Sequence, residues 1–321
     1  MPTDGAPSYT TSVRILYLGL PLGAVVLLRA GLAPVGCMIG HPDAIGMRRL
    51  RRTLPRQTLI LGRPSLDDAA VRAAIASTGY DVLLSWFWPR RIPMELIAAA
   101  SRGAFGVHPS LLPRWRGPDP YFHAIRAGDA ETGVTLHRLD AEYDTGALID
   151  HRSLAIRDDD TGWTLARRLD RPSLALLVSC AQRLARGEEL PGAPQPDRGI
   201  TLAPRPEEDD LVLDFEGEDA DALARLVRAA APEPGASALL EETLVTVQRA
   251  RVWRGAFPSG LRAGEAFLAP EGVVVRARRD GLLLERVRAE EDDRLVEGAA
   301  IGALLREGEG APVDGPTGDQ G

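Results

Sequence analysis

The chain has 321 residues, enough for two domains with cores of their own, and its 45% hydrophobic content is ordinary for a globular protein. It contains no apolar run of membrane-spanning length, and residues 1–12 lack the basic and apolar regions of a signal peptide, so we expect a polar, disordered leader on a cytoplasmic protein. The only cysteines, Cys37 and Cys180, lie far apart, which excludes a disulfide framework and argues against a metal site.

The first part of the chain alternates strand-like and helix-like runs. Residues 13–39 form a strand, helix and strand pattern. Ser65 has the chemistry of an N-cap for the next helix, and 81–86 follows as a buried strand. This alternation predicts a Rossmann-like α/β domain. The arginine-rich stretch Arg48–Arg52 is either a solvated face or a contact for a polyanion.

An aromatic segment follows the strand at 81–86. It contains Trp86, Phe87 and Trp88, before a proline. In open α/β sheets the ligand crevice lies outside the carboxyl ends of the strands. These side chains could therefore form a wall for a flat heterocycle, although core packing is the ordinary role of such residues.

The centre of the chain carries two further motifs. A buried run at 104–107 ends on His108 and is broken at once by Pro109, so it predicts a strand that delivers a histidine into an irregular loop. About thirty residues later, a second β-rich run leads to an acidic turn that contains Asp144. A strand-end imidazole and a turn carboxylate could form an acid–base pair.

The two motifs, HPSLLPRWRG at 108–117 and TGVTLHRLDAEYDTG at 132–146, resemble the signature of the tetrahydrofolate-dependent formyltransferases. That family includes methionyl-tRNA, glycinamide ribonucleotide and sugar-nucleotide formyltransferases. The resemblance implies transfer of a formyl group from 10-formyltetrahydrofolate to a primary amine. The family's catalytic residues are an Asn-x-His and the Asp of the DTG, and these positions are Gly106, His108 and Asp144 here. No asparagine occurs anywhere in the chain, so no neighbour can replace the missing amide by a shift in register.

The resemblance also implies where the carrier and the acceptor bind. The pterin is expected against two segments, Trp86, Phe87 and Trp88, and Leu139, Asp140, Ala141, Glu142 and Tyr143. The loop expected to border the acceptor comprises Ser110, Leu111, Leu112, Pro113, Arg114, Arg116 and Gly117. The Ser110 hydroxyl could replace part of the lost amide, and the two arginines could meet an anionic substrate or face solvent. We interpret His123 and His137 as structural.

The composition changes after residue 187. Residues 188–204 form a proline-rich linker that divides a catalytic domain at 13–187 from a small β-rich domain at 205–306, and a disordered tail follows at 307–321. Short alternating runs in the second domain predict an OB-like barrel. The pattern resembles the C-terminal barrel of methionyl-tRNA formyltransferase.

Charge divides unequally between the two parts. From Arg205 onward there are 14 arginines and 25 acidic residues, a net of −11, and the first 204 residues carry 24 arginines and 20 acidic residues, a net of +4. An acidic second domain disfavours tRNA as a partner, because binding to nucleic acid depends on neutralising phosphates.

Gly106 leaves two alternatives to formyl transfer open. The chain could be a folate-binding or regulatory homologue with impaired turnover, or the same scaffold could serve a different acyl or one-carbon transfer. Losing one oxyanion donor costs about 10²–10³ in rate without abolishing catalysis. We expect Gly106→Asn to raise formyl transfer, provided that the loop leaves room for the side chain.

Overall fold

The computed structural model describes residues 13–41 and 43–308, so the predicted leader and nearly all of the predicted tail lie outside the described residues. The described chain forms two compact units. The first comprises the residues up to Pro120 together with Glu131–Ala155 and Ala166–Pro204. The second comprises Tyr121–Ala130, Ile156–Leu165 and the residues from Arg205 onward. The second unit therefore includes two short segments that precede its main part in the chain.

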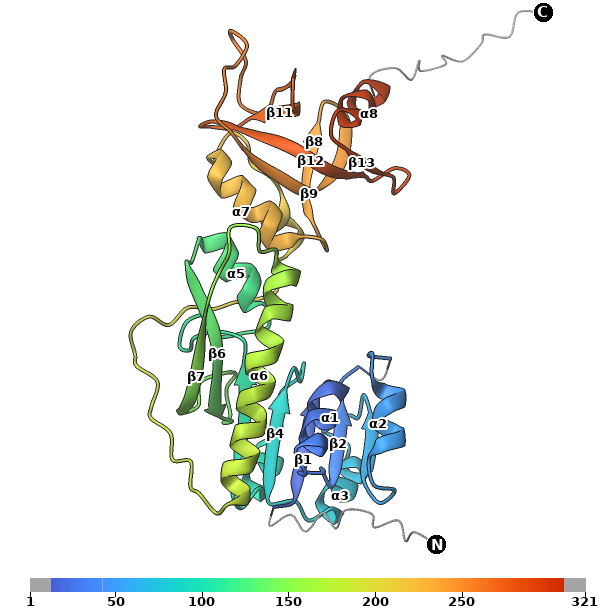
Figure 1. Cartoon of the computed structure of the whole chain (residues 1–321), viewed down its shortest axis with the longest axis vertical. Helices are drawn as coiled ribbons and strands as arrows, with labels where there is room; N and C mark the ends of the chain where they lie inside the picture. Colours follow the sequence, from blue (N-terminus) through green and yellow to red (C-terminus); the bar gives the residue numbers. More distant parts are fainter. Residues whose placement is uncertain (1–12, 42, 309–321) are drawn as a thin grey trace, which may run out of the picture. The chain divides into compact units, whose positions relative to one another are not determined.

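A seven-stranded sheet forms the core of the first unit, in the order β3-β2-β1-β4-β5-β6-β7 (Figure 1). The first five strands run parallel and the last two are antiparallel. The strands are β1 (Ile15–Gly19), β2 (Gly36–Ile39), β3 (Leu59–Gly62), β4 (Val82–Trp86), β5 (Ala104–His108), β6 (Glu131–Arg138) and β7 (Leu148–Ala155). The predicted Rossmann-like α/β domain is confirmed. Strand order reverses between β1 and β4, the kind of point at which ligand crevices form in such sheets.

Helices follow six of these strands along the chain, as the alternating pattern predicts (Figure 1). They are α1 (Pro21–Arg29), α2 (Met47–Thr53), α3 (Ala69–Ser77), α4 (Met94–Ala99), α5 (Pro120–Ala127) and α6 (Gly162–Ala185). The predicted cap of α3 was wrong. Asp68, and not Ser65, accepts the backbone N–H groups of Ala70 and Val71, because the helix begins three residues later than predicted. No helix within the described ranges is long and apolar enough to cross a membrane.

The second unit is built on an antiparallel sheet in the order β10-β11-β12-β9-β8, with β13 paired to β12. Its elements are η1 (Glu208–Leu211), α7 (Ala220–Ala230), β8 (Ala236–Leu240), β9 (Thr243–Trp253), β10 (Ala266–Ala269), β11 (Gly272–Arg276), β12 (Gly281–Ala289), β13 (Leu295–Glu297) and α8 (Ala300–Gly308). The predicted β-rich second domain is confirmed. The apolar face of α7, which includes Leu223, Leu226 and Val227, is buried.

The segment at 188–204, which the sequence suggests as a linker, is bonded along its length to the first unit. Ala193 forms a bridge with Leu148 of β7, and Leu202 forms one with Arg116. We call this segment the strap. Its contacts reach the loop and the turn that carry the two central motifs.

Candidate active site

His108 ends β5, the strand next to β4 in the sheet. Its side chain is buried, and its Nε2 lies 2.8 Å from the carbonyl oxygen of Trp115. A carbonyl can only accept, so we infer that Nε2 carries a hydrogen and donates it to this carbonyl, which leaves Nδ1 to face the rest of the site. The strand thus delivers the imidazole into the loop in one defined orientation.

Asp144 lies opposite Nδ1 of His108. Its Oδ2 is 3.4 Å from Nδ1 of His108 and accepts the backbone N–H of Gly117 at 3.0 Å. Asp144 itself has a left-handed backbone, with φ of 58°. The strand-end histidine of the first motif and the turn carboxylate of the second, which are distant in sequence, therefore face each other.

The turn that holds Asp144 depends on its neighbours. Thr145 donates its hydroxyl to the carboxylate of Asp140, which also accepts the N–H of Glu142. A Cβ at Gly146 would lie 1.9 Å from the carbonyl oxygen of Arg138, so only glycine fits there. The D-x-x-x-DTG pattern therefore largely specifies a turn that directs the Asp144 carboxylate toward His108.

The loop 109–117 is held from within. Ser110 is fully buried and donates its hydroxyl to the carbonyl of Arg114, and its own carbonyl accepts the hydroxyl of Thr135. Thr135 also accepts the N–H of Leu112. The suggestion that the Ser110 hydroxyl replaces the missing amide is therefore wrong, because that hydroxyl is used within the loop.

The remaining loop residues have different roles from those that the sequence suggests. Leu112 is buried, and the guanidinium of Arg114 lies over the Trp115 ring at 4.3 Å. Arg116 donates Nε and Nη2 to the side-chain oxygen of Gln195. Arg116 therefore binds the strap in this structure and does not lie open to an anionic substrate.

Gln195 of the strap joins the loop to the acidic turn. Its amide nitrogen donates to the backbone carbonyls of Asp144 and Gly146, at 2.7 and 2.9 Å, while its oxygen accepts from Arg116. Six residues on, the Thr201 hydroxyl accepts the N–H of Trp115. Sequence reasoning missed both residues, because a proline-rich polar run without periodicity carries no signal of its hydrogen-bond partners.

Gly106 lies on β5, paired with His137 of β6. A Cβ at this position would lie 2.9 Å from Cδ2 of Leu139 and 3.0 Å from Nε2 of His137. An asparagine at this position therefore requires the ends of the Leu139 and His137 side chains to shift, and the expected gain depends on that shift.

His137, which the sequence suggests is structural, also lies beside Asp144. It is buried, its Nδ1 lies 2.8 Å from the carbonyl of Arg138, and its Nε2 lies 3.7 Å from Oδ1 of Asp144. Burial lowers the pKa of His137, while Asp144 raises it and His108 lowers it. Asp144 therefore has an imidazole beside each of its two carboxylate oxygens.

The aromatic segment is arranged differently from the predicted three-residue wall. Trp86 lies in the core, 1% exposed, with its ring against Phe87 at a centroid distance of 5.0 Å. Phe87 has a left-handed backbone, and it and Trp88 are partly exposed. The predicted wall therefore loses Trp86, and Trp88 also packs against the hydrophobic core of the first unit.

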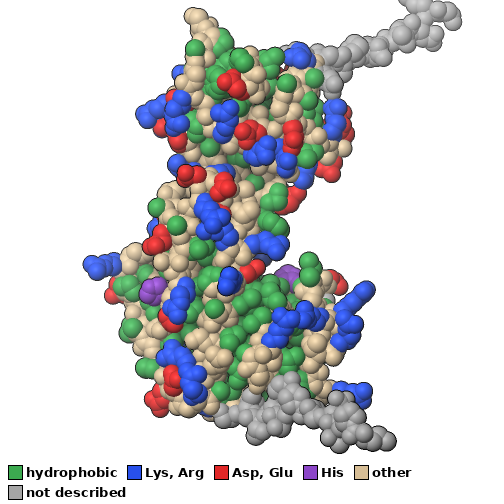
Figure 2. Space-filling model, viewed as in Figure 1, with side chains coloured by type: hydrophobic (Ala, Val, Ile, Leu, Met, Phe, Trp, Pro, Cys, Tyr) green, Lys and Arg blue, Asp and Glu red, His purple; other side chains and the backbone are tan. Residues whose placement is uncertain are grey.

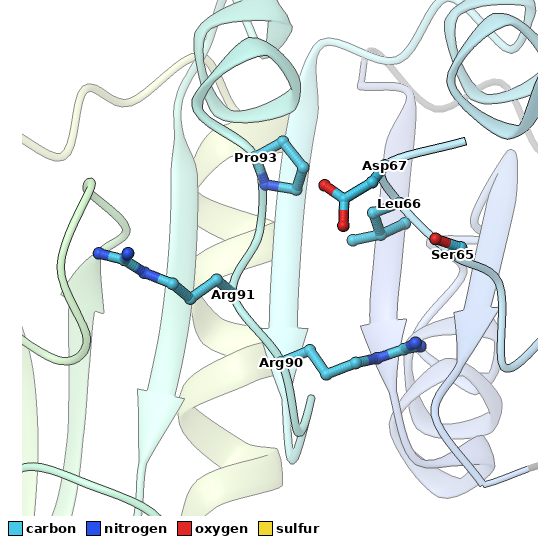
Figure 3. A pocket seen from close by; sticks show the side chains of 6 residues that line it. All are labelled: Ser65, Leu66, Asp67, Arg90, Arg91 and Pro93. Atoms are coloured by element: carbon cyan, nitrogen blue, oxygen red, sulfur yellow. The ribbon is translucent and has the colours of Figure 1, made fainter. Parts of the chain in front are cut away.

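A pocket of about 340 Å³ lies beside this segment, lined by Ser65, Leu66, Asp67, Arg90, Arg91 and Pro93. Figure 3 shows the Arg90 and Arg91 side chains extending in opposite directions. Arg90 donates to the carbonyl of Pro64. Arg91 reaches the acidic turn, where it donates to the carbonyl of Ala141, pairs with Glu142 at 2.9 Å and lies over the Tyr143 ring. The two segments expected to hold the carrier are therefore joined by Arg91.

Comparisons with known proteins agree with these motifs. Residues 41–180 match the model of the formyl transferase family, and residues 207–297 match that of the formyl transferase C-terminal domain. Methionyl-tRNA formyltransferases from Burkholderia vietnamiensis and Burkholderia multivorans are each 34% identical to this chain. The alignments cover 89% and 86% of this chain and 93% and 86% of the relatives.

Solved structures share the fold. HypX from Aquifex aeolicus in complex with tetrahydrofolic acid has a TM-score of 0.62 at 21% identity, covering 92% of this chain and 47% of that one. The N-formyltransferase from Helicobacter canadensis in complex with folinic acid and dTDP-3-aminofucose has a TM-score of 0.62 at 13% identity, covering 89% and 99%. The chain therefore belongs to the formyl transferase family and contains both its N-terminal and its C-terminal domain.

Proposed function

We propose that this protein transfers a formyl group from 10-formyltetrahydrofolate to a primary amine. The observation that carries the proposal is the pairing of His108 and Asp144, at 3.4 Å, at the end of β5. Membership of the family supports it, as do the curated relatives named methionyl-tRNA formyltransferase.

The reaction needs a donor for the formyl oxygen and a route for the amine's proton. The Nε2–H of His108 is such a donor, and in this structure it is held by the Trp115 carbonyl. We propose that the formyl oxygen replaces that carbonyl as the acceptor when substrates bind. Asp144 faces the ring's other nitrogen and stabilises positive charge on the ring, and the amine's proton passes to N10 of the folate as the bond from N10 to the formyl carbon breaks.

The residues around the aromatic segment fit a flat carrier with hydrogen-bond acceptors. Among the described side chains, the indole N–H of Trp88 is buried without a protein acceptor. It lies two residues from Arg90 and three from Arg91, which line the neighbouring pocket. Structures of similar fold contain tetrahydrofolic acid or folinic acid, which supports a folate as carrier here.

A specific observation keeps a second function open. With Gly106 in place of the family's asparagine, the described site has no carboxamide on β5 beside His108. A folate-binding homologue with slow turnover, or a different acyl or one-carbon transfer on the same scaffold, is the alternative that this position supports.

The test is incubation with 10-formyltetrahydrofolate and a panel of amines that includes methionyl-tRNA and amino sugar nucleotides, following release of tetrahydrofolate. We expect release that depends on one amine and is lost in His108→Gln. The exposed His151 provides the matched control, His151→Gln, which should leave the rate unchanged. Folate binding without release for any amine would favour the alternative.

A further inference from the structure

Ser85 is the residue of β4 that retains some exposed surface. The other four residues of the strand are at most 1% exposed, whereas Ser85 is 8% exposed. It lies next to the carboxyl end of the strand, where ligand crevices form in sheets of this kind. The core therefore covers β4 along its length except at a hydroxyl near the expected crevice.

The strand register places Ser85 on the same face of the sheet as the catalytic histidine. Ser85 pairs with Gly106 of the neighbouring parallel strand, and residues paired in this way direct their side chains to the same face. Positions 106 and 108 are two apart on β5 and also share a face. Ser85 and His108 therefore lie on one face, and Gly106 places no side chain between them.

The separation of these two positions suits one shared ligand atom. Adjacent strands lie about 4.8 Å apart and two residues advance by about 6.6 Å, so the Cα atoms of Ser85 and His108 are roughly 8 Å apart. A hydroxyl and an imidazole that extend from these positions can both reach an oxygen between them through hydrogen bonds of about 2.8 Å.

The Ser85 hydroxyl forms no hydrogen bond within the part of the chain that the structure describes. Ser110 in the nearby loop shows the usual arrangement of a buried serine, because its hydroxyl donates to the carbonyl of Arg114. A nearly buried hydroxyl without a partner costs free energy, which a bound acceptor would recover. Ser85 is therefore available to donate to a ligand on the same face as His108.

We propose that Ser85 is a catalytic residue, whose hydroxyl donates a hydrogen bond to the formyl oxygen. The inference deepens the proposed function and rests on it. As the amine nitrogen bonds to the formyl carbon and the bond from that carbon to N10 breaks, the amine's proton passes to N10. The Ser85 hydrogen stays on its hydroxyl throughout and stabilises the negative charge that develops on the formyl oxygen. Ser85 thus supplies from β4 a donor for which Gly106 offers no side chain on β5.

A serine that only fills the strand would behave differently when it is changed. In that case Ser85→Ala would alter neither ligand binding nor rate, because it removes only a hydroxyl without a protein partner. Under both interpretations the variant should unfold at the same temperature as the unmodified protein or a higher one. Thermal unfolding therefore verifies that any loss of function is not a loss of fold.

The first experiment measures binding without turnover. The affinities for 10-formyl-5,8-dideazafolate and for 5,8-dideazafolate, which lacks the formyl group, are compared in the unmodified protein and in Ser85→Ala. We expect Ser85→Ala to weaken binding of the formylated compound alone, by about two- to tenfold, the effect of one neutral hydrogen bond. Equal changes for the two compounds, or no change, would overturn the proposal.

Ser173→Ala is the matched control. Ser173 is a buried serine of α6 in the first unit, and its hydroxyl also lacks a hydrogen-bond partner among the described residues. The same substitution there should leave both affinities unchanged. A formyl-specific loss in Ser173→Ala as well would contradict the assignment to Ser85.

The second experiment concerns the reaction. Ser85→Ala should lower kcat for formyl transfer by about 10², the effect of losing one oxyanion donor, with little change in KM for the amine. Ser85→Thr keeps a hydroxyl and should retain most of the rate. An unchanged kcat in Ser85→Ala would overturn the catalytic role. A formyl-specific loss of binding without turnover for any amine would confirm the contact and refute the proposed function alone, and failure of the unmodified protein to bind either compound would refute both.

Discussion

At the scale of single residues, Asp144 has the most contacts in the candidate site. Its carboxylate faces His108, His137 and the N–H of Gly117, and its carbonyl accepts from Gln195. Asp144→Asn keeps the shape and removes the charge. We expect the rate to fall by about 10²–10⁴ with folate binding retained, because an amide cannot stabilise an imidazolium. Single-turnover kinetics with a folate-binding assay would check this, and an unchanged rate would show that His108 acts without the carboxylate.

The buried His137 gives stability a pH dependence. Its pKa is lowered from the ordinary 6.5, so below that value the unfolded chain binds a proton more readily than the folded one. The stabilisation is fully present above pH 6.5 and is lost as pH falls toward the folded-state pKa. Urea unfolding at several pH values should show a smaller acid destabilisation in His137→Met than in the unmodified protein. Equal slopes in the two would mean that the ring does not change its protonation on unfolding.

The structure predicts that Gly106→Asn lowers stability, whereas the sequence led us to expect a higher rate of formyl transfer. Gly106→Asn must displace both Leu139 and His137, and overpacking of this kind typically destabilises by about 1–3 kcal/mol. We expect lower stability and no increase in rate from Gly106→Asn alone. The double variant Gly106→Asn, His137→Ala makes room for the amide and should recover stability relative to the sum of the single changes. A higher rate in the single variant would show that the ring moves aside freely.

At the scale of elements, the strap connects the two catalytic segments. Removing Gln195 leaves the carbonyls of Asp144 and Gly146 and the guanidinium of Arg116 without their partner. We expect Gln195→Ala to destabilise the protein by about 1–3 kcal/mol, the cost of leaving partly buried groups unsatisfied, and to lower kcat/KM. Gln182, exposed on α6 in the same unit, is the matched control. Equal stability and activity in both variants would mean that the strap is only a connection.

At the scale of the whole molecule, arginines and acidic residues alternate over the second unit, as Figure 2 shows. Eight of the ten arginines between 249 and 294 form ion pairs: Arg249, Arg251, Arg254, Arg278, Arg279, Arg286, Arg288 and Arg294. Such residues must break a pair before they neutralise a phosphate.

We therefore expect methionyl-tRNA to be formylated slowly or not at all, with tRNA binding in the nonspecific range of about 10⁻⁴–10⁻⁶ M. The measurement is the salt dependence of both binding and rate. Efficient formylation with a steep salt dependence would contradict this. Loss of that activity on changing the exposed Arg48, Arg49, Arg51 and Arg52 of α2 to glutamine would then identify the compensating surface.

The sequence by itself determined the family, the α/β and β-rich domains, and the choice of His108 and Asp144. These depend on local periodicity and on two linked motifs that are each contiguous in the chain. Only the tertiary structure decided the rest. Strand pairing places His137 against Gly106, 31 positions away, and the strap brings Gln195 to Asp144, 51 positions away. Strand register and the need to satisfy buried carbonyls bring such distant residues together, and no local sequence pattern encodes either of them.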